Sequence, residues 1–180
     1  MNVKEIKINH ILEQGFELFS KEGIDNVTMN NIADKAEIGV ASLYRYFSTK
    51  EELAIQCATK MWQKEKEKAI DIFTSEKYLK KTGKDQLEEI LNYFETSFDT
   101  TQDFYRFIYY FDSYIKRQNI ESSNLQNYEN TIEEITQIAF QAIYQFLLDY
   151  QLPSGKKYHL HRINHRNYYE RNTQTKFYFP

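Results

Sequence analysis

The sequence predicts an all-α protein, and three observations support this prediction. Apolar residues recur at spacings of three and four over most of residues 1–150, and no strand-like alternation interrupts them. Only 5 Gly and 2 Pro occur among the 180 residues, which leaves room for long helices. Two short helical segments joined by a tight turn lie between Thr28 and Phe47, an arrangement typical of a helix-turn-helix.

The N-terminal helices have recognisable ends. Asn2 can cap the first helix and Gly23 follows its last turn, where a left-handed residue is common. Thr28 is a suitable N-cap for a second, short helix, which Gly39 ends. A third short segment is expected over 40–47. The first helix carries an apolar stripe, and the third segment has three residues expected on one side: Ile8, Ile11, Leu12, Phe16 and Phe19; then Leu43, Tyr44 and Phe47.

Longer helices are expected after residue 47. Ser48 or Thr49 can cap a fourth helix that continues to about Phe73, through a charged run at 64–68 that is most simply a solvated surface. The remaining expected segments, in order, are a loop from Ser75 to Gly83, helices over 85–98 and 101–118, a loop over 119–124, and a long amphipathic helix from Leu125 to about Tyr150.

The charge distribution separates the last thirty residues from the rest. The chain has 23 Lys plus Arg against 26 Asp plus Glu, a net charge of −3, which excludes a generally basic nucleic-acid-coating protein but permits a local DNA-binding face. Residues 151–180 alone carry a net charge of +5 and three of the four His. We therefore expect three regions: 1–50, 51–150 and an atypical basic tail at 151–180. A divergent last helix, a truncation or a frameshift could each explain the tail.

Composition excludes several kinds of site. A single cysteine rules out an internal disulfide and a multi-cysteine metal site, and Cys57 is expected to be buried in the fourth helix rather than to act as a redox sensor. His161 and His165 could share a helix face and bind a metal, but a solvated basic tail explains them better. No cofactor is expected. The absence of a signal-peptide core and of a long apolar run predicts a cytoplasmic protein without membrane contact.

The segment from Thr28 to Leu53 points to DNA. Small residues at 39–42 open the third segment, so the start of that helix could approach base edges closely. Tyr44, Arg45 and Tyr46 come one turn later, and Lys50 begins the next helix, where a phosphate contact is natural. Phe47 is expected in the core.

The same segment resembles the DNA-binding signature of TetR-family (tetracycline-repressor-type) transcriptional regulators. The resemblance covers about Lys7 to Leu53 and includes Thr28–Ala33, Ala36–Phe47 and the sequence Lys-Glu-Glu-Leu at 50–53. It implies an N-terminal three-helix DNA-binding domain and a helical C-terminal domain that binds a ligand and forms a homodimer. It also implies the following DNA-contacting residues: Thr28, Gly39, Val40, Ala41, Ser42, Tyr44, Arg45, Tyr46 and Lys50.

Two residues depart from the family pattern. Glu37 stands in the turn where the family often has Gly, so either the turn is slightly strained or Gly39 provides the needed freedom. Gly15 stands where Ala is common and should cost the first helix up to about 1 kcal/mol.

An aromatic segment at 104–114 suggests a second site. Seven of these eleven residues are aromatic, which predicts a helix buried on more than one side. Core packing explains most of them, but some could line the effector pocket that the family resemblance implies. Arg106 with Asp112 could anchor a ligand or form a surface ion pair. The candidate lining residues are Trp62, Phe94, Phe98, Phe107, Tyr110, Phe111, Tyr114 and Tyr144.

These observations lead to a functional hypothesis. The chain is expected to be a ligand-responsive regulator, usually a repressor, that binds a double-stranded DNA operator and is released by a small hydrophobic or aromatic effector. The alternative is an all-α ligand-binding or interaction protein with weak or lost DNA binding. An enzyme is not expected, because the sequence offers no nucleophile–base set, metal cluster or phosphate-binding glycine loop.

Overall fold

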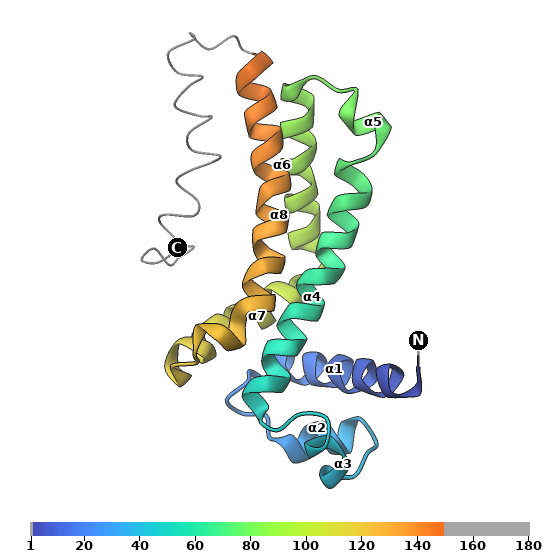
Figure 1. Cartoon of the computed structure of the whole chain (residues 1–180), viewed down its shortest axis with the longest axis vertical. Coiled ribbons are helices and arrows are strands. Elements are labelled where there is room, and N and C mark those ends of the chain that lie inside the picture. The colour runs from blue at the N-terminus through green and yellow to red at the C-terminus, as the bar shows by residue number, and fades with distance from the viewer. Residues whose placement is uncertain (1, 150–180) are drawn as a thin grey trace.

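The computed structural model describes residues 2–149, and within this range the regular elements are all α-helices (Figure 1). The prediction of an all-α fold, with an N-terminal helix-turn-helix domain and a helical C-terminal domain, is confirmed. None of the described helices is long and apolar enough to cross a membrane. The helices are α1 (Val3–Glu22), α2 (Met29–Lys35), α3 (Val40–Tyr44), α4 (Lys50–Phe73), α5 (Glu76–Leu79), α6 (Gly83–Thr100), α7 (Gln102–Gln118) and α8 (Ser122–Asp149).

The described helices form an elongated molecule in which α4 connects two ends. Helices α1, α2 and α3 gather at the lower end of Figure 1, and α4 leads upward from them to pack against α8, which also packs along α6. Helix α7 lies at the base of this bundle and contacts both α1 and α4. Helix α1 therefore packs against α2, which packs against α3, and the bundle is connected to these helices through α4 and α7.

Side-chain caps begin α1, α2 and α4, as the sequence predicts. The side chains of Asn2, Thr28 and Thr49 each accept a hydrogen bond from the backbone N–H three residues later. Helix α1 closes at Gly23, whose φ of +80° falls where a side chain would be strained. The caps fix where α1, α2 and α4 start, and hence where the connecting turns lie.

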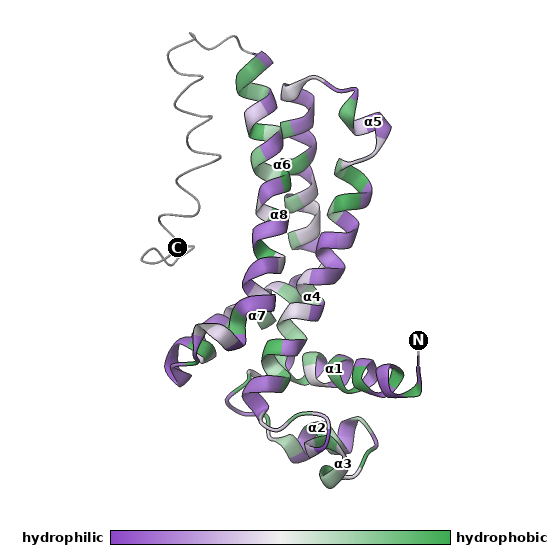
Figure 2. Cartoon of the chain, in the orientation of Figure 1, coloured by the Kyte–Doolittle hydropathy of each residue, from purple (hydrophilic) through white to green (hydrophobic). Residues whose placement is uncertain are grey.

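A continuous core joins the N-terminal helices to α7. Leu43 and Phe47 are fully buried beside Ile32 of α2 and Leu53 of α4, and the same cluster includes Phe107 of α7. A second, smaller core at the other end of the bundle contains Ala69, Phe73, Tyr78, Ile90 and Ala142. Figure 2 shows hydrophobic and hydrophilic residues interleaved along the helices, the pattern of amphipathic elements.

Several details differ from the sequence-based expectation. The loop predicted over 75–83 contains the helix α5, because a four-residue helix is too short to show a period. Helix α6 begins at Gly83 rather than Asp85, and α8 begins at Ser122 rather than Leu125. Tyr44 does not share the buried side of Leu43 and Phe47, because neighbouring residues on a helix point about 100° apart. The basic tail at 151–180, with His161 and His165, lies outside the described residues.

Candidate nucleic-acid interface

The turn between α2 and α3 uses Glu37 in a left-handed conformation. Its φ is +53°, whereas Gly39 has a φ of −65°, so the departure from glycine is accommodated by Glu37 itself. Two backbone hydrogen bonds hold the turn, from Glu37 N to Asp34 O at 3.1 Å and from Ile38 N to Ala33 O at 3.0 Å. A non-glycine residue in this conformation costs about 1 kcal/mol, which these bonds offset.

Helix α3 presents one exposed side. Ala41, Tyr44 and Arg45 follow the spacing of one helix face and are exposed, and Tyr44 keeps 51% of its surface accessible. Leu43, on the other side, is completely buried and fixes the orientation of the helix. The exposed side of α3 therefore carries an aromatic ring, a methyl group and a guanidinium, which suit base-edge and phosphate contacts.

The other residues predicted to contact DNA are placed around α3. Val40 and Ser42 are half-buried, and the Ser42 hydroxyl accepts a hydrogen bond from Arg45 Nη2 at 2.7 Å. Gly39 is exposed at the N-terminus of α3, with no atom near the position that a Cβ would take. Tyr46 is half-buried against the core.

Thr28 is exposed, but its hydroxyl has a local role. It accepts a hydrogen bond from Asn31 N at 3.2 Å and donates one to Asn31 Oδ1 at 2.6 Å. Asn31 Oδ1 also accepts from the Thr28 N–H at 2.9 Å, which completes a capping box. Thr28 thus fixes the start of α2, and its side chain remains exposed.

Lys50 is directed at the protein backbone. Its ammonium donates to Ile24 O at 2.8 Å and to Val27 O at 3.0 Å, and it lies 5.4 Å from the ring centre of Tyr114. In this structure Lys50 therefore ties the start of α4 to the linker between α1 and α2. The sequence led us to expect a phosphate contact for Lys50. It could not predict the bonds to Ile24 O and Val27 O, because the fold alone brings these carbonyl groups to the ammonium.

Helix α7 contacts the N-terminal helices through polar groups as well as the core. The Tyr114 hydroxyl donates to Glu51 Oε1, and Arg117 forms an ion pair with Asp25 in the α1–α2 linker. Burial and the neighbouring carboxylate of Glu51 raise the pKa of the Tyr114 hydroxyl, so it stays protonated and able to donate. These contacts link the helical bundle to the base of the helix-turn-helix.

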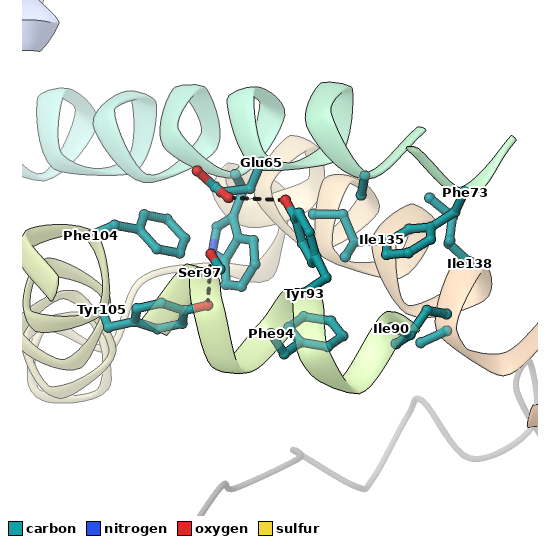
Figure 3. A pocket seen from close by; sticks show the side chains of 13 residues that line it. Glu65, Phe73, Ile90, Tyr93, Phe94, Ser97, Phe104, Tyr105, Ile135 and Ile138 are labelled. Carbon is teal, nitrogen blue, oxygen red and sulfur yellow. Dashed lines mark hydrogen bonds between the residues drawn. The ribbon is translucent and has the colours of Figure 1, made fainter. Parts of the chain in front are cut away.

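A cavity between α4, α6, α7 and α8 is the second candidate site (Figure 3). Of the predicted lining residues, Trp62 and Phe94 do line it. The structure places Phe107, Phe111 and Tyr114 in the main core instead, because α7 turns those positions toward α1 and α4. Phe98, Tyr110 and Tyr144 are not among the lining residues. The sequence missed most of the cavity, which is also lined by Glu65, Ala69, Phe73, Ile90, Tyr93, Ser97, Phe104, Tyr105, Ile135, Ile138 and Ala139.

Glu65 gives this cavity its charge. Its Oε1 accepts a bond from Lys68 at 2.6 Å and its Oε2 one from the Tyr93 hydroxyl at 3.4 Å, as Figure 3 shows for Tyr93. Burial and the Glu65 carboxylate raise the pKa of Tyr93 to about 12. The Tyr105 hydroxyl of α7 donates to Ser97 Oγ of α6 at 3.4 Å. The cavity is therefore aromatic, with neutral hydroxyl groups and one carboxylate.

The Arg106–Asp112 pair considered from the sequence does not form. Arg106 pairs with Asp103 at 3.0 Å, and Asp112 accepts a hydrogen bond from the Tyr128 hydroxyl at 3.3 Å. Residues six apart on a helix lie on different sides, whereas residues three apart are neighbours. Among the described residues, no group of three or more His, Cys, Asp and Glu side chains could hold a metal ion.

Comparisons with known proteins agree with this geometry. The family model described as "Bacterial regulatory proteins, tetR family" matches residues 11–57. HTH-type transcriptional regulators of Staphylococcus aureus strains USA300 and N315 are each 42% identical to this chain over 52 residues, which is 28% of either length. The match thus spans little more than a quarter of these relatives.

Two solved structures share the fold over most of the chain. A Clostridium perfringens protein described as a candidate fatty acid metabolism regulator has a TM-score of 0.53 at 16% identity and covers 94% of this chain and 89% of its own. A TetR-like transcriptional regulator from Rhodococcus sp. RHA1 has a TM-score of 0.51 at 16% identity and covers 94% of this chain and 100% of its own. At this identity the two structures establish the fold alone.

The fold and the exposed α3 define a protein of the helix-turn-helix class with a separate helical bundle. Within that class, residues 11–57 match the TetR family of bacterial regulatory proteins, the family that the N-terminal helices resemble.

Proposed function

We propose that this protein is a ligand-responsive repressor that binds an operator as a homodimer through α3. The observation that carries the proposal is the exposed face of α3, where Ala41, Tyr44 and Arg45 stand free of the core while Leu43 anchors the helix. Two such helices in a dimer would enter successive major grooves about 34 Å apart. The protein would act in the cytoplasm, where its DNA is.

Affinity in this proposal comes from placed contacts and from pairing two subunits. The segment from Thr28 to Lys50 carries Lys35, Arg45 and Lys50 against Asp34 and Glu37, a net charge of only +1. Lys35 is already paired with Glu17 at 3.2 Å. Bulk electrostatic attraction is therefore small, and a single subunit should bind DNA weakly.

The effector part of the proposal depends on the cavity in the bundle. An effector there would touch α4, the helix that follows α3 in the chain, and α7, which holds Glu51 and Asp25 through Tyr114 and Arg117. Displacing these helices would favour a dimer spacing that no longer fits the operator. Release is then a shift between two conformations with different affinities for DNA.

DNA binding can be tested by footprinting on the region upstream of the protein's own gene. Wild-type protein should protect a two-fold symmetric site, and Tyr44→Ala should weaken binding at least tenfold. Tyr109→Ala is a matched control, because Tyr109 is 70% exposed on α7, away from α3. No protection at low salt, or equal binding by the Tyr44 and Tyr109 variants, would overturn the proposal and favour a ligand-binding protein that does not regulate.

The dimer is tested separately by sedimentation equilibrium of the full chain. A two-subunit species is expected at micromolar concentration, and a monomer under those conditions would contradict this part of the proposal.

A further inference from the structure

The cavity between α4, α6, α7 and α8 combines aromatic rings with one carboxylate. We propose that it binds an organic cation, with the positive group among the aromatic rings beside Glu65 and an apolar body against α8. The inference rests on the effector site of the proposed function and adds the chemical class of the ligand.

Six aromatic rings surround the cavity from three helices. They pack edge to face, as in Trp62 against Phe104 with ring centres 4.9 Å apart at 84°, and Phe73 against Tyr93 at 5.3 Å and 82°. In such a packing ring faces and edges both border the enclosed space, and the negative face of an aromatic ring attracts a cation. Aromatic cages of this kind recognise quaternary ammonium groups. The six rings belong to Trp62, Phe73, Tyr93, Phe94, Phe104 and Tyr105.

Glu65 determines which sign of charge the cavity accepts. It is the one charged residue among the described lining residues, and 13% of its side chain is exposed. Its ion-pair partner Lys68 is 54% exposed, so that pair is weakly held and a bound cation could take its place. An anion would instead meet a carboxylate without a cationic residue in the wall, and a neutral ligand would gain no electrostatic attraction from that carboxylate.

The size of the cavity requires movement on binding. The centre of a water molecule can move within only about 20 Å³ of the cavity. The cavity therefore has room for little more than one water molecule. Phe94 lies in the wall on α6 and is 41% exposed. Its ring can therefore swing outward into solvent and widen the cavity. Binding would thus stabilise a more open arrangement of the walls, as an effector must.

The test uses three probes that share a phenylbutyl body and the natural fluorescence of the protein. The probes are 4-phenylbutyltrimethylammonium, the hydrocarbon in which carbon replaces its nitrogen, and the anion 5-phenylpentanoate. Trp62 is the single tryptophan of the chain and lines the cavity, so it reports binding directly. Each probe is titrated into the full-length wild-type protein without DNA. The cation should bind at least tenfold more tightly than the neutral isostere, and the anion should bind more weakly still.

Two variants locate the charge. Glu65→Gln should lower the affinity for the cation at least tenfold and leave that for the neutral isostere unchanged. Glu67→Gln is the matched control, because Glu67 lies on the same helix but is exposed. Tyr93→Leu should also lower the affinity for the cation more than that for the neutral isostere. It provides a second variant if Glu65→Gln is unstable.

Clear outcomes would overturn the inference. Equal binding of cation and isostere by the wild type, no fluorescence change with the cation up to millimolar concentration, or equal cation affinities of the Glu65 and Glu67 variants would each do so. Because these titrations contain no DNA, their failure leaves the DNA-binding proposal intact. Conversely, cation binding without release of DNA would support the ligand class and contradict the effector role.

Discussion

Replacing Lys50 by Met tests whether this residue stabilises the folded protein or contacts a DNA phosphate. The ammonium donates at 2.8 Å to Ile24 O and at 3.0 Å to Val27 O, in the linker that precedes α2. A net hydrogen bond to a charged group contributes about 1.5–3 kcal/mol, and the half-buried position of Lys50 reduces the sum of the two. We expect Lys50→Met to lower the free energy of unfolding by about 2 kcal/mol, which for a chain of this size lowers Tm by about 4–8 °C.

The DNA side of this test is the salt dependence of binding. Each lysine that contacts a phosphate contributes about 0.9 to the magnitude of the slope of log K against log salt concentration, so a dimer gains this contribution once per subunit. The contacts of Lys50 with the linker predict that the slopes of wild type and Lys50→Met are the same, even if the variant binds more weakly overall. Anisotropy of labelled operator DNA over several salt concentrations measures the slope, and thermal unfolding followed by circular dichroism measures Tm.

A control lysine makes the comparison specific. Lys21 lies in the last turn of α1 and pairs with Glu17 on the surface, so Lys21→Met should leave Tm unchanged within error. The reasoning is refuted if Lys50→Met melts like the wild type while its slope falls by about one unit per subunit. Lys50 would then be a phosphate ligand whose backbone contacts contribute nothing measurable.

Three further predictions follow from the described side chains. Gly83→Ala should lower the free energy of unfolding by about 1–3 kcal/mol, because its Cβ would lie 2.5 Å from the backbone of α8. Urea unfolding measures this change. Gly39→Ala serves as control, because no atom lies within 4 Å of the position of its Cβ. Although burial raises the pKa of Glu51, the bond from Tyr114 and other hydrogen bonds lower it overall, so stability linked to Glu51 is present above about pH 4.5 and is lost as the pH falls through the folded-state pKa. The stability difference between wild type and Tyr114→Phe should therefore shrink on acidification, and a constant difference would count against this linkage. Burial raises the pKa of the Cys57 thiol, so the folded protein should resist iodoacetamide at pH 8 and react only in denaturant; rapid labelling of the native state would disprove it.

The N-terminal helices could be predicted closely because their ends depend on local chemistry. Thr28 and Thr49 cap helices through atoms three residues away, and Leu43 and Phe47 are buried as their spacing indicated. Gly15 shows what spacing cannot give. A Cβ at that position would lie 2.9 Å from Leu53 Cδ2 and 3.4 Å from Cys57 Sγ, so the close approach of α4 explains a glycine that sequence alone could only count as a cost.

The cavity was harder to predict because it depends on which way each helix turns. The aromatic segment on α7 drew attention to Phe107 and Phe111, but these rings complete the core with α1. The cavity uses the first turn of α7, through Phe104 and Tyr105, together with Tyr93 on α6. A helix that is aromatic nearly all round gives no preferred face in its hydrophobic pattern, so tertiary contacts alone assign each ring.

Helix α4 provides the physical connection between the two candidate sites. Glu65 lies fifteen residues after Lys50 in one unbroken helix, a rise of about 22 Å. A change in the tilt of α4 at the cavity must therefore move Lys50 and Glu51, which hold the α1–α2 linker and Tyr114. Helix α7 contributes Tyr105 to the cavity and Tyr114 to the hydrogen bond with Glu51 of α4. An effector that separates α4 from α7 would therefore move both partners of that hydrogen bond. The proposed coupling needs two stiff helices and one shared contact, and α3 can move without unfolding.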